Sequence, residues 1–168
     1  MRHYIDADLN KSGGGKSFLR SFFNPRVRYV VLLRHFEYHS NNNGLWHRIL
    51  CAYYWYQKQH LGLKLGFTVP KNCFGPGLCI AHYGLLVVNS KAKIGANCRV
   101  HAGVNIGEKD GKAPVIGDNA YIGPGAKIFG DIKIENNVTI GANAVVNKSF
   151  PDNCVIAGIP ARIIKYKK

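Results

Sequence analysis

An aliphatic residue recurs at every sixth position through most of the second half of this 168-residue chain. Ten positions keep this phase on the two sides of an insertion, GEKDGKAPV: Val88, Ile94, Val100, Ile106, Ile116, Ile122, Ile128, Ile134, Ile140 and Val146. A second set follows four positions later and is small or aliphatic: Ala92, Cys98, Val104, Ala120, Ala126, Ile132, Val138 and Ala144. Upstream, Thr68, Phe74 and Ile80 continue the spacing.

A period of six fits neither a helix nor simple hairpins, and it is typical of a parallel β-helix. Three short strands and their turns would form one coil, with the recurring aliphatic residue stacked on its counterpart about 4.8 Å along the axis. Glycine and asparagine suit the turns, because they adopt backbone conformations that β-branched residues avoid. We therefore expect a mainly β fold with roughly four coils over 68–150.

The preceding residues have a different character and indicate helices. Residues 1–67 contain 13 of the 19 aromatic residues. Asn24-Pro25 is a typical helix start, and a second helix is expected after Asn43, with Gly62 as its stop. Its apolar residues recur at helical spacing: Leu45, Trp46, Ile49, Leu50, Tyr53 and Tyr54. The predicted organisation is an N-terminal helical region (1–67), a β-helix (68–150) and a C-terminal tail (151–168).

Composition limits the kinds of binding partner and the cellular compartment that we expect. Lys and Arg number 23 against 9 Asp and Glu, a net charge of +14, which favours an anionic partner. No common nucleic-acid-binding motif is present, so nucleic acid is not expected. The stretch SGGGKS at 12–17 is not a phosphate-binding P-loop, because Asn10 stands where that motif needs glycine. No apolar run is long enough to span a membrane, and five cysteines without a CxxC pair indicate reduced thiols in the cytoplasm.

The six-residue rhythm breaks in the stretch IAHYGLLVV, residues 80–88, where two extra residues are inserted around His82. Taken alone, a histidine in such an insertion is more often a solvated or structural loop residue than a catalytic one. The alternative is that the insertion exists to present the imidazole.

The chain resembles the hexapeptide-repeat acyltransferases, and within them the serine-acetyltransferase-like branch. The resemblance covers residues 25–168 and is specific in three segments: GLCIAHYGLLVVNSKAKIGANCRVHAGVNIG, VIGDNAYIGPGAKIFGDIKIENNVTIGANAVV and VIAGIPARIIKYK. It implies a left-handed β-helix, a homotrimer, and acetyl-CoA bound between neighbouring subunits. The left-handed winding of the coils is implied only by the resemblance, since crossover connections between parallel strands are generally right-handed.

The resemblance makes His82 the general base, because a histidine in a motif like IAHYG has that role in the family. Neutral imidazole can remove the proton of an attacking hydroxyl, and backbone N–H groups of a glycine-rich turn would stabilise the oxyanion. Tyr83 and His101 are candidate acceptor-binding residues; for His101 an outward-facing polar residue is the alternative. Cys79 and Cys98 are interpreted as structural thiols, so no acyl-enzyme is expected.

For acetyl-CoA, the resemblance indicates two groups of residues. Pro124, Ala142 and Asn147 match positions that line the thiol arm through main-chain contacts. Lys148, Arg162 and Lys165 stand where related enzymes contact the cofactor, although a solvated basic tail is the alternative. No metal is expected, because a zinc site of the carbonic anhydrase type needs three histidines and the repeat contains His82 and His101 only.

Several family positions are altered. Phe67 and Ala81 align with aspartates of serine acetyltransferases, and Lys112-Ala113 replace an Arg-His pair that helps to hold the amino acid. The group that orients His82 would then be a backbone carbonyl, Glu37 or an acid of another chain. These departures favour an O-acetyltransferase acting on a saccharide hydroxyl in surface or capsular polysaccharide synthesis, with possible contact with an anionic membrane. The alternatives are an L-serine O-acetyltransferase of cysteine biosynthesis and a non-catalytic β-helix scaffold.

Overall fold

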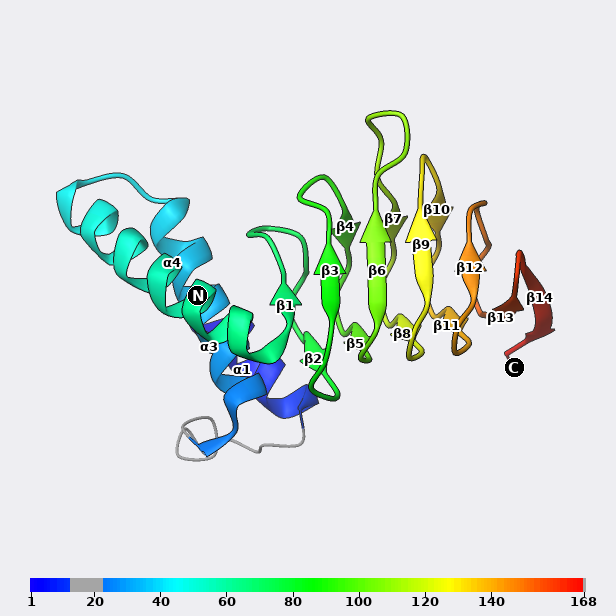
Figure 1. The fold of residues 1–168 in the computed structure, drawn as a ribbon, viewed down its shortest axis with the longest axis horizontal. Helices are drawn as coiled ribbons and strands as arrows, with labels where there is room; N and C mark the ends of the chain where they lie inside the picture. Colours follow the sequence, from blue (N-terminus) through cyan, green and yellow to red (C-terminus); the bar gives the residue numbers. More distant parts are fainter. Residues whose placement is uncertain (13–22, 168) are drawn as a thin grey trace.

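The computed structural model describes residues 1–12 and 23–167, so nearly all of SGGGKS lies outside the described residues. Three described helices lead into a β-helix: α1 (Arg2–Lys11), α3 (Pro25–Ser40) and α4 (Leu45–Leu65). The helices gather at one end of the β-helix, and its coils follow one another along the long axis toward the C-terminus (Figure 1). The predicted fold class, a mainly β parallel β-helix preceded by helices, is confirmed.

The helix starts agree with the sequence-based expectation, but one predicted end does not. Asn24 Oδ1 accepts a hydrogen bond from the Arg26 N–H at 3.1 Å, which caps α3. Gly62 does not stop α4, which continues to Leu65 and ends at Gly66 with a φ of +77°. Gly62 is instead required by packing, because a Cβ there would lie 2.7 Å from the Phe67 carbonyl oxygen.

The β-helix has three faces, each a sheet whose strands come from successive coils. Sheet A consists of β1 (Phe67–Thr68), β3 (Leu86–Val88), β6 (Val104–Gly107), β9 (Lys127–Phe129) and β12 (Val145–Val146). Sheet B consists of β4 (Lys93–Ile94), β7 (Val115–Ile116) and β10 (Lys133–Ile134). Sheet C consists of β2 (Cys79–Ile80), β5 (Arg99–Val100), β8 (Tyr121–Ile122), β11 (Thr139–Ile140), β13 (Cys154–Gly158) and β14 (Ala161–Tyr166).

Sheet A has five strands, which gives five coils where four were expected. Phe74 and Phe150 make isolated bridges to sheet B and complete its first and last coils. All pairs in the three sheets are parallel except the last, in which β14 turns back against β13. Residues 154–166 therefore extend sheet C.

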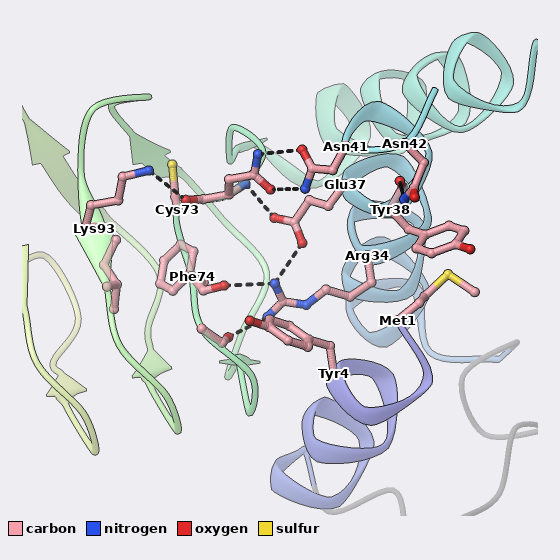
Figure 2. A pocket seen from close by; sticks show the side chains of 13 residues that line it. Met1, Tyr4, Arg34, Glu37, Tyr38, Asn41, Asn42, Cys73, Phe74 and Lys93 are labelled. Atoms are coloured by element: carbon pink, nitrogen blue, oxygen red, sulfur yellow. Dashed lines mark hydrogen bonds and ion pairs between the residues drawn. The ribbon is translucent and has the colours of Figure 1, made fainter. Parts of the chain in front are cut away.

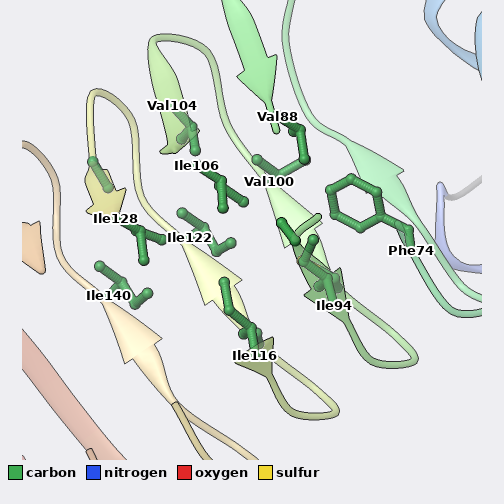
Figure 3. Packing of buried hydrophobic residues seen from close by; sticks show 14 of the residues in the cluster. Phe74, Val88, Ile94, Val100, Val104, Ile106, Ile116, Ile122, Ile128 and Ile140 are labelled. Carbon is green, nitrogen blue, oxygen red and sulfur yellow. The ribbon is translucent and has the colours of Figure 1, made fainter. Parts of the chain in front are cut away.

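The core is a stack of the predicted aliphatic residues, which point inward from all three sheets (Figure 3). Every predicted inward position is buried except Thr68, which is exposed. The prediction for Thr68 was wrong because β1 pairs Phe67 with Leu86 and Thr68 with Val87, and Val87 faces outward. Phe67 occupies the interior instead, with its ring 5.2 Å from that of Tyr29 on α3.

A buried ionic network joins α1 and α3 to the first coil. Arg34 donates from Nε to Asp8 Oδ2 at 2.7 Å and from Nη1 to Glu37 Oε2 at 2.9 Å. Arg34 also donates to the carbonyls of Phe74 and Gly75 at 2.9 and 2.7 Å. The Asp8 carboxylate accepts the backbone N–H groups of Gly77 and Leu78, both at 2.7 Å. The helices are thereby fixed to the start of the β-helix.

Candidate active site

The two-residue insertion at His82 lies at the corner where the chain passes from sheet C to sheet A. Its backbone is bonded to the end of α4: Gly84 N donates to the Leu65 carbonyl at 3.3 Å, and Leu86 N to that of Gly66 at 2.9 Å. A Cβ at Gly66 would lie 3.3 Å from the Gly84 carbonyl carbon, so two glycines permit this close approach. The insertion is thus held against the helical region.

Arg26, in the first turn of α3, holds the same insertion from another side. Its Nη1 donates to the carbonyls of Ile80, at 3.2 Å, and of Ala81, the residue before His82. Its guanidinium carbon lies 5.3 Å from the centre of the Tyr83 ring, a cation–π arrangement. Arg26 therefore fixes the backbone on the N-terminal side of His82 and the ring that follows it.

His82 is exposed, and its ring centre lies 5.5 Å from that of His101, which comes from the next coil. His101 is buried and lies in turn 4.9 Å from the Tyr121 ring. Burial lowers the pKa of His101, and the nearby charges of Arg99 and His82 lower it further. The two predicted histidines are therefore neighbours: His82 is exposed, and His101 is buried with a lowered pKa.

No acidic residue stands at this corner to orient either ring. All nine Asp and Glu residues lie in the described ranges, and none makes an ion pair or a hydrogen bond with His82 or His101. Glu37 was one candidate for orienting His82, but its two oxygens accept from Arg34 and from the Asn72 N–H. The other two candidates for orienting His82, a backbone carbonyl and an acid of another chain, stay predictions.

The small residues predicted to line acetyl-CoA continue the His82 corner along the axis. The strand register places His82, Ala102, Pro124 and Ala142 at successive coils of one edge, the C–A corner. Gly125 N donates to the Ala102 carbonyl at 2.9 Å and Asn143 N to that of Pro124 at 2.8 Å, which stacks these turns. Pro124 and Ala142 are both exposed, so this part of the edge is apolar and open to solvent.

The remaining predicted acetyl-CoA residues are divided between two places. Arg162 pairs with Ala157 and Lys165 with Val155 on the β14 edge of sheet C, near the end of the C–A corner. Asn147 and Lys148 follow β12 on a different edge, between sheets A and B, where Asn147 lines a hollow of about 400 Å³. Within one chain, Asn147 and Lys148 do not meet the His82 edge.

The positions that differ from serine acetyltransferases lie in different parts of the structure. Ala81 precedes His82 and is buried, whereas Phe67 packs inside the core. Lys112 and Ala113 lie on the edge between sheets A and B, where Lys112 pairs with Asp131. The Arg-His replacement is therefore remote from His82 within a single subunit.

A second cavity, of about 410 Å³, lies between α1, α3 and the first coils (Figure 2), and His82 is not among its lining residues. Its polar groups already bond to one another: Arg34 uses all its N–H groups, and the Asn41 and Asn72 amides bond reciprocally at 2.9 and 3.0 Å. This cavity presents no free partner for a ligand among those groups.

The cysteines have the properties of buried structural thiols. All five are free, and only Cys51 is not buried. Burial raises the pKa of Cys73 to about 11 and that of Cys98 to about 12. Such thiols are poor nucleophiles at neutral pH. In the described part of the chain, no group of three or more His, Cys, Asp or Glu residues could hold a metal ion.

Sequence reasoning missed Arg26, Arg99 and Tyr121. Arg99 Nε lies 3.4 Å from His101 Nε2, and Arg99 and Tyr121 are register partners on the outer face of sheet C. Both precede an inward aliphatic residue by one position, a signal that the six-residue repeat could have provided. Nothing in the local sequence connects Arg26 with Ile80, 54 residues away.

The repeat is similar in sequence to that of known bacterial transferases. The family model "Bacterial transferase hexapeptide (six repeats)" matches residues 113–148. A serine acetyltransferase of Staphylococcus epidermidis is 44% identical over 95 residues, 54% of this chain and 45% of the relative. The chain thus spans about half the length of the curated relatives it matches.

The structural matches extend over nearly the whole chain. A crystal structure of serine acetyltransferase from Brucella abortus matches with a TM-score of 0.77 and 26% identity, covering 99% of this chain and 70% of that one. A structure of that enzyme in complex with coenzyme A has a TM-score of 0.76 and 25% identity, covering 99% and 67%. The resemblance inferred from the sequence is confirmed.

Proposed function

We propose that this chain, a hexapeptide-repeat protein of the bacterial transferase type, is an acetyl-CoA-dependent O-acetyltransferase with His82 as general base. The observation that carries the proposal is the position of His82. It is exposed in an insertion held by Arg26 and α4, and it shares one edge with Pro124 and Ala142. The Brucella abortus relative bound to coenzyme A supports this donor.

In the proposed reaction, the neutral His82 imidazole takes the proton of the acceptor hydroxyl as its oxygen attacks the thioester carbon. Collapse of the tetrahedral intermediate breaks the carbon–sulfur bond, and the imidazolium returns the proton to the departing thiolate. The products are an acetyl ester and free coenzyme A. His101 contributes a neutral neighbour, because its lowered pKa avoids a second positive charge beside His82.

The relatives' names favour L-serine as acceptor. Both the Staphylococcus epidermidis sequence and the Brucella abortus structures are serine acetyltransferases. L-serine thereby replaces the saccharide preferred from the sequence as the leading acceptor, and cysteine biosynthesis replaces polysaccharide synthesis as the leading context.

A saccharide hydroxyl is the second candidate, because of the charge at the C–A corner. Arg26, Arg99, His82 and His101 meet there without a bonded acid. An ammonium group bound there would lack a counter-charge from this chain, and an unpaired buried charge is costly. A neutral sugar has no such need.

Assembly and donor contacts complete the proposal. We propose a homotrimer in the cytoplasm, in which the Asn147–Lys148 edge of one subunit faces the C–A corner of the next. Acetyl-CoA would then contact Pro124 and Ala142 from one subunit and the basic residues Lys148, Arg162 and Lys165 at its phosphates. Light scattering that shows a stable monomer at micromolar concentration would contradict this arrangement.

The decisive experiment follows coenzyme A release with a thiol reagent in His82→Ala, His101→Ala and the control His3→Ala. His82→Ala should lower kcat by about 10²–10⁴-fold, the span for a positioned base. His3 is exposed on α1, and its variant should match the wild type. Full activity of His82→Ala would refute the role of His82.

The acceptor is tested with the same assay, using L-serine and a panel of mono- and oligosaccharides. Saturable turnover with L-serine alone supports the leading acceptor. Turnover with a saccharide and none with L-serine supports the second. A folded protein inactive with every acceptor, and not stabilised by coenzyme A in a thermal shift, would favour a scaffold.

A further inference from the structure

The outer face of α4 is an exposed apolar stripe. From Leu45 to Tyr56 its members are three or four residues apart along one side of the helix or directly beside that line, and Leu63 follows on the same side two turns later. Each of these residues is 36–85% exposed. The stripe comprises Leu45, Trp46, Ile49, Leu50, Tyr53, Tyr56 and Leu63. Neighbouring exposed apolar residues on one helix face are typical of an interaction site in soluble proteins.

The opposite side of α4 is the one that packs. Lys58 and Gly62 are its buried residues, and both face α3. Figure 1 shows α4 beside α3 and projecting away from the β-helix, so the coils leave its outer face uncovered. The stripe is therefore not part of the core of the described chain.

The charge of α4 selects the kind of partner. Its exposed cations are Arg48 and Lys64, whereas Lys58 faces α3, and the helix contains no Asp or Glu. The whole chain carries +14, and two of its nine acids, Asp8 and Glu37, are buried in the Arg34 network. An apolar face rich in Trp and Tyr on a basic, acid-free helix is typical of segments that lie in a membrane interface.

We propose that the α4 stripe docks on an anionic lipid surface, with the helix lying in the plane of the interface. At about 1.5 Å per residue, the 21 residues of α4 extend about 30 Å along that surface. No helix in the described ranges is long and apolar enough to cross a membrane, so the contact is peripheral. Anionic headgroups would supply the counter-charge that the chain lacks.

A second copy of the chain fits this face less well. Pairing two α4 stripes would bring together two basic helices without an acidic residue on either. Like charges across an interface oppose association, whereas an anionic bilayer attracts the same surface. The lipid surface is therefore the occupant that charge complementarity favours.

Docking would also place the candidate active site beside the bilayer. Leu63, the last member of the stripe, lies one turn from Gly66, which touches the His82 insertion at Gly84. An acceptor attached to a lipid would then reach His82 without leaving the membrane. This consequence rests on the proposed acetyl transfer with the second candidate acceptor, a saccharide, whereas the docking itself does not.

The two tryptophans provide a direct test, because they lie on different sides of α4. Trp46 belongs to the stripe, whereas Trp55 lines a hollow with Phe36 and His39 of α3. Full-length Trp55→Phe and Trp46→Phe variants each retain one indole. With phosphatidylcholine vesicles containing phosphatidylglycerol, Trp46 emission should shift to the blue and become protected from acrylamide, while Trp55 emission stays unchanged. Equal responses, or none, would overturn the proposal.

Vesicle flotation provides the quantitative arm. Ile49→Gln/Tyr53→Gln should lower partitioning at least about tenfold through lost apolar burial, and Trp55→Gln is the matched control. Vesicles of phosphatidylcholine alone, or high salt, should also weaken binding. Activity with a soluble acceptor should survive in the double variant, so failure of docking is distinguishable from failure of acetyl transfer. Lipid docking would be refuted if the double variant partitioned as well as the wild type. It would also be refuted if the wild type self-associated with rising concentration and the double variant did not.

Discussion

Replacing Asp8 by alanine should destabilise the protein strongly, although Asp8 lies in a short terminal helix. Its carboxylate is 3% exposed and accepts four hydrogen bonds, two from Arg34 and two from the backbone of Gly77 and Leu78. Removing it leaves the buried guanidinium with Glu37 as its remaining acidic partner, and it leaves two buried N–H groups unbonded.

The expected cost follows from that geometry. Breaking a buried ion pair costs about 3–5 kcal/mol, because one charge stays buried without its partner. Glu37 retains its contact with Arg34 Nη1 at 2.9 Å, so the lower end, about 3 kcal/mol, applies. For a chain of this size that corresponds to a fall in Tm of about 6–12 °C.

The assay is thermal and urea unfolding followed by circular dichroism at one fixed protein concentration. Asp6→Ala is the matched control, because Asp6 is exposed on the same helix and its loss should change the free energy of unfolding by less than about 0.5 kcal/mol. Asp8→Ala within about 1 kcal/mol of that control would refute the view that the Asp8–Arg34 pair joins α1 to the first coil.

Three further results are expected. Ile122→Ala, in the fully buried stack, should lower the free energy of unfolding by about 2–5 kcal/mol in urea melts, while the exposed Val115→Ala serves as control. Arg26→Gln should lower kcat about tenfold, a proposed positioning effect on His82, with Tm nearly unchanged; a large loss of Tm instead would make its role structural. Burial and the neighbouring His47 lower the pKa of His39. The neutral form of His39 therefore contributes fully to the free energy of unfolding above about pH 6.5, and this contribution is lost as the pH falls through the folded pKa. In melts between neutral and acidic pH, His39→Gln should make the free energy of unfolding less dependent on pH.

The β-helix was predictable because its core repeats. Each inward aliphatic residue contacts a like residue one coil away, so the requirement for burial appears in the sequence at a fixed interval. The exception, Thr68, lies where the repeat begins. There the register is set by the end of α4 at Gly66 and by Tyr29 packing on Phe67. The six-residue period carries no information about either contact.

The helical region was predictable in its elements and much less in its contacts. The spacing of apolar residues predicts α4, but it does not say which side the rest of the chain covers. Gly62 determines the packed side, because it allows the Phe67 carbonyl and Tyr29 to approach the helix. Ile49 and Tyr53, on the other side, are exposed. Arg26 was beyond sequence reasoning, because its partners are two carbonyls 54 and 55 residues away.

The repeat by itself makes all corners of the β-helix equivalent, so it cannot account for a site at one of them. At the first C–A corner the equivalence ends, because α4 and Arg26 bond to the chain on both sides of His82. At the later turns of that edge, Asn143 N bonds to the Pro124 carbonyl in the regular stacking of the coils, and the described helices make no hydrogen bond to Pro124 or Ala142. The proposed role of His82 therefore depends on the non-repeating helices, because they fix the backbone on both sides of this imidazole.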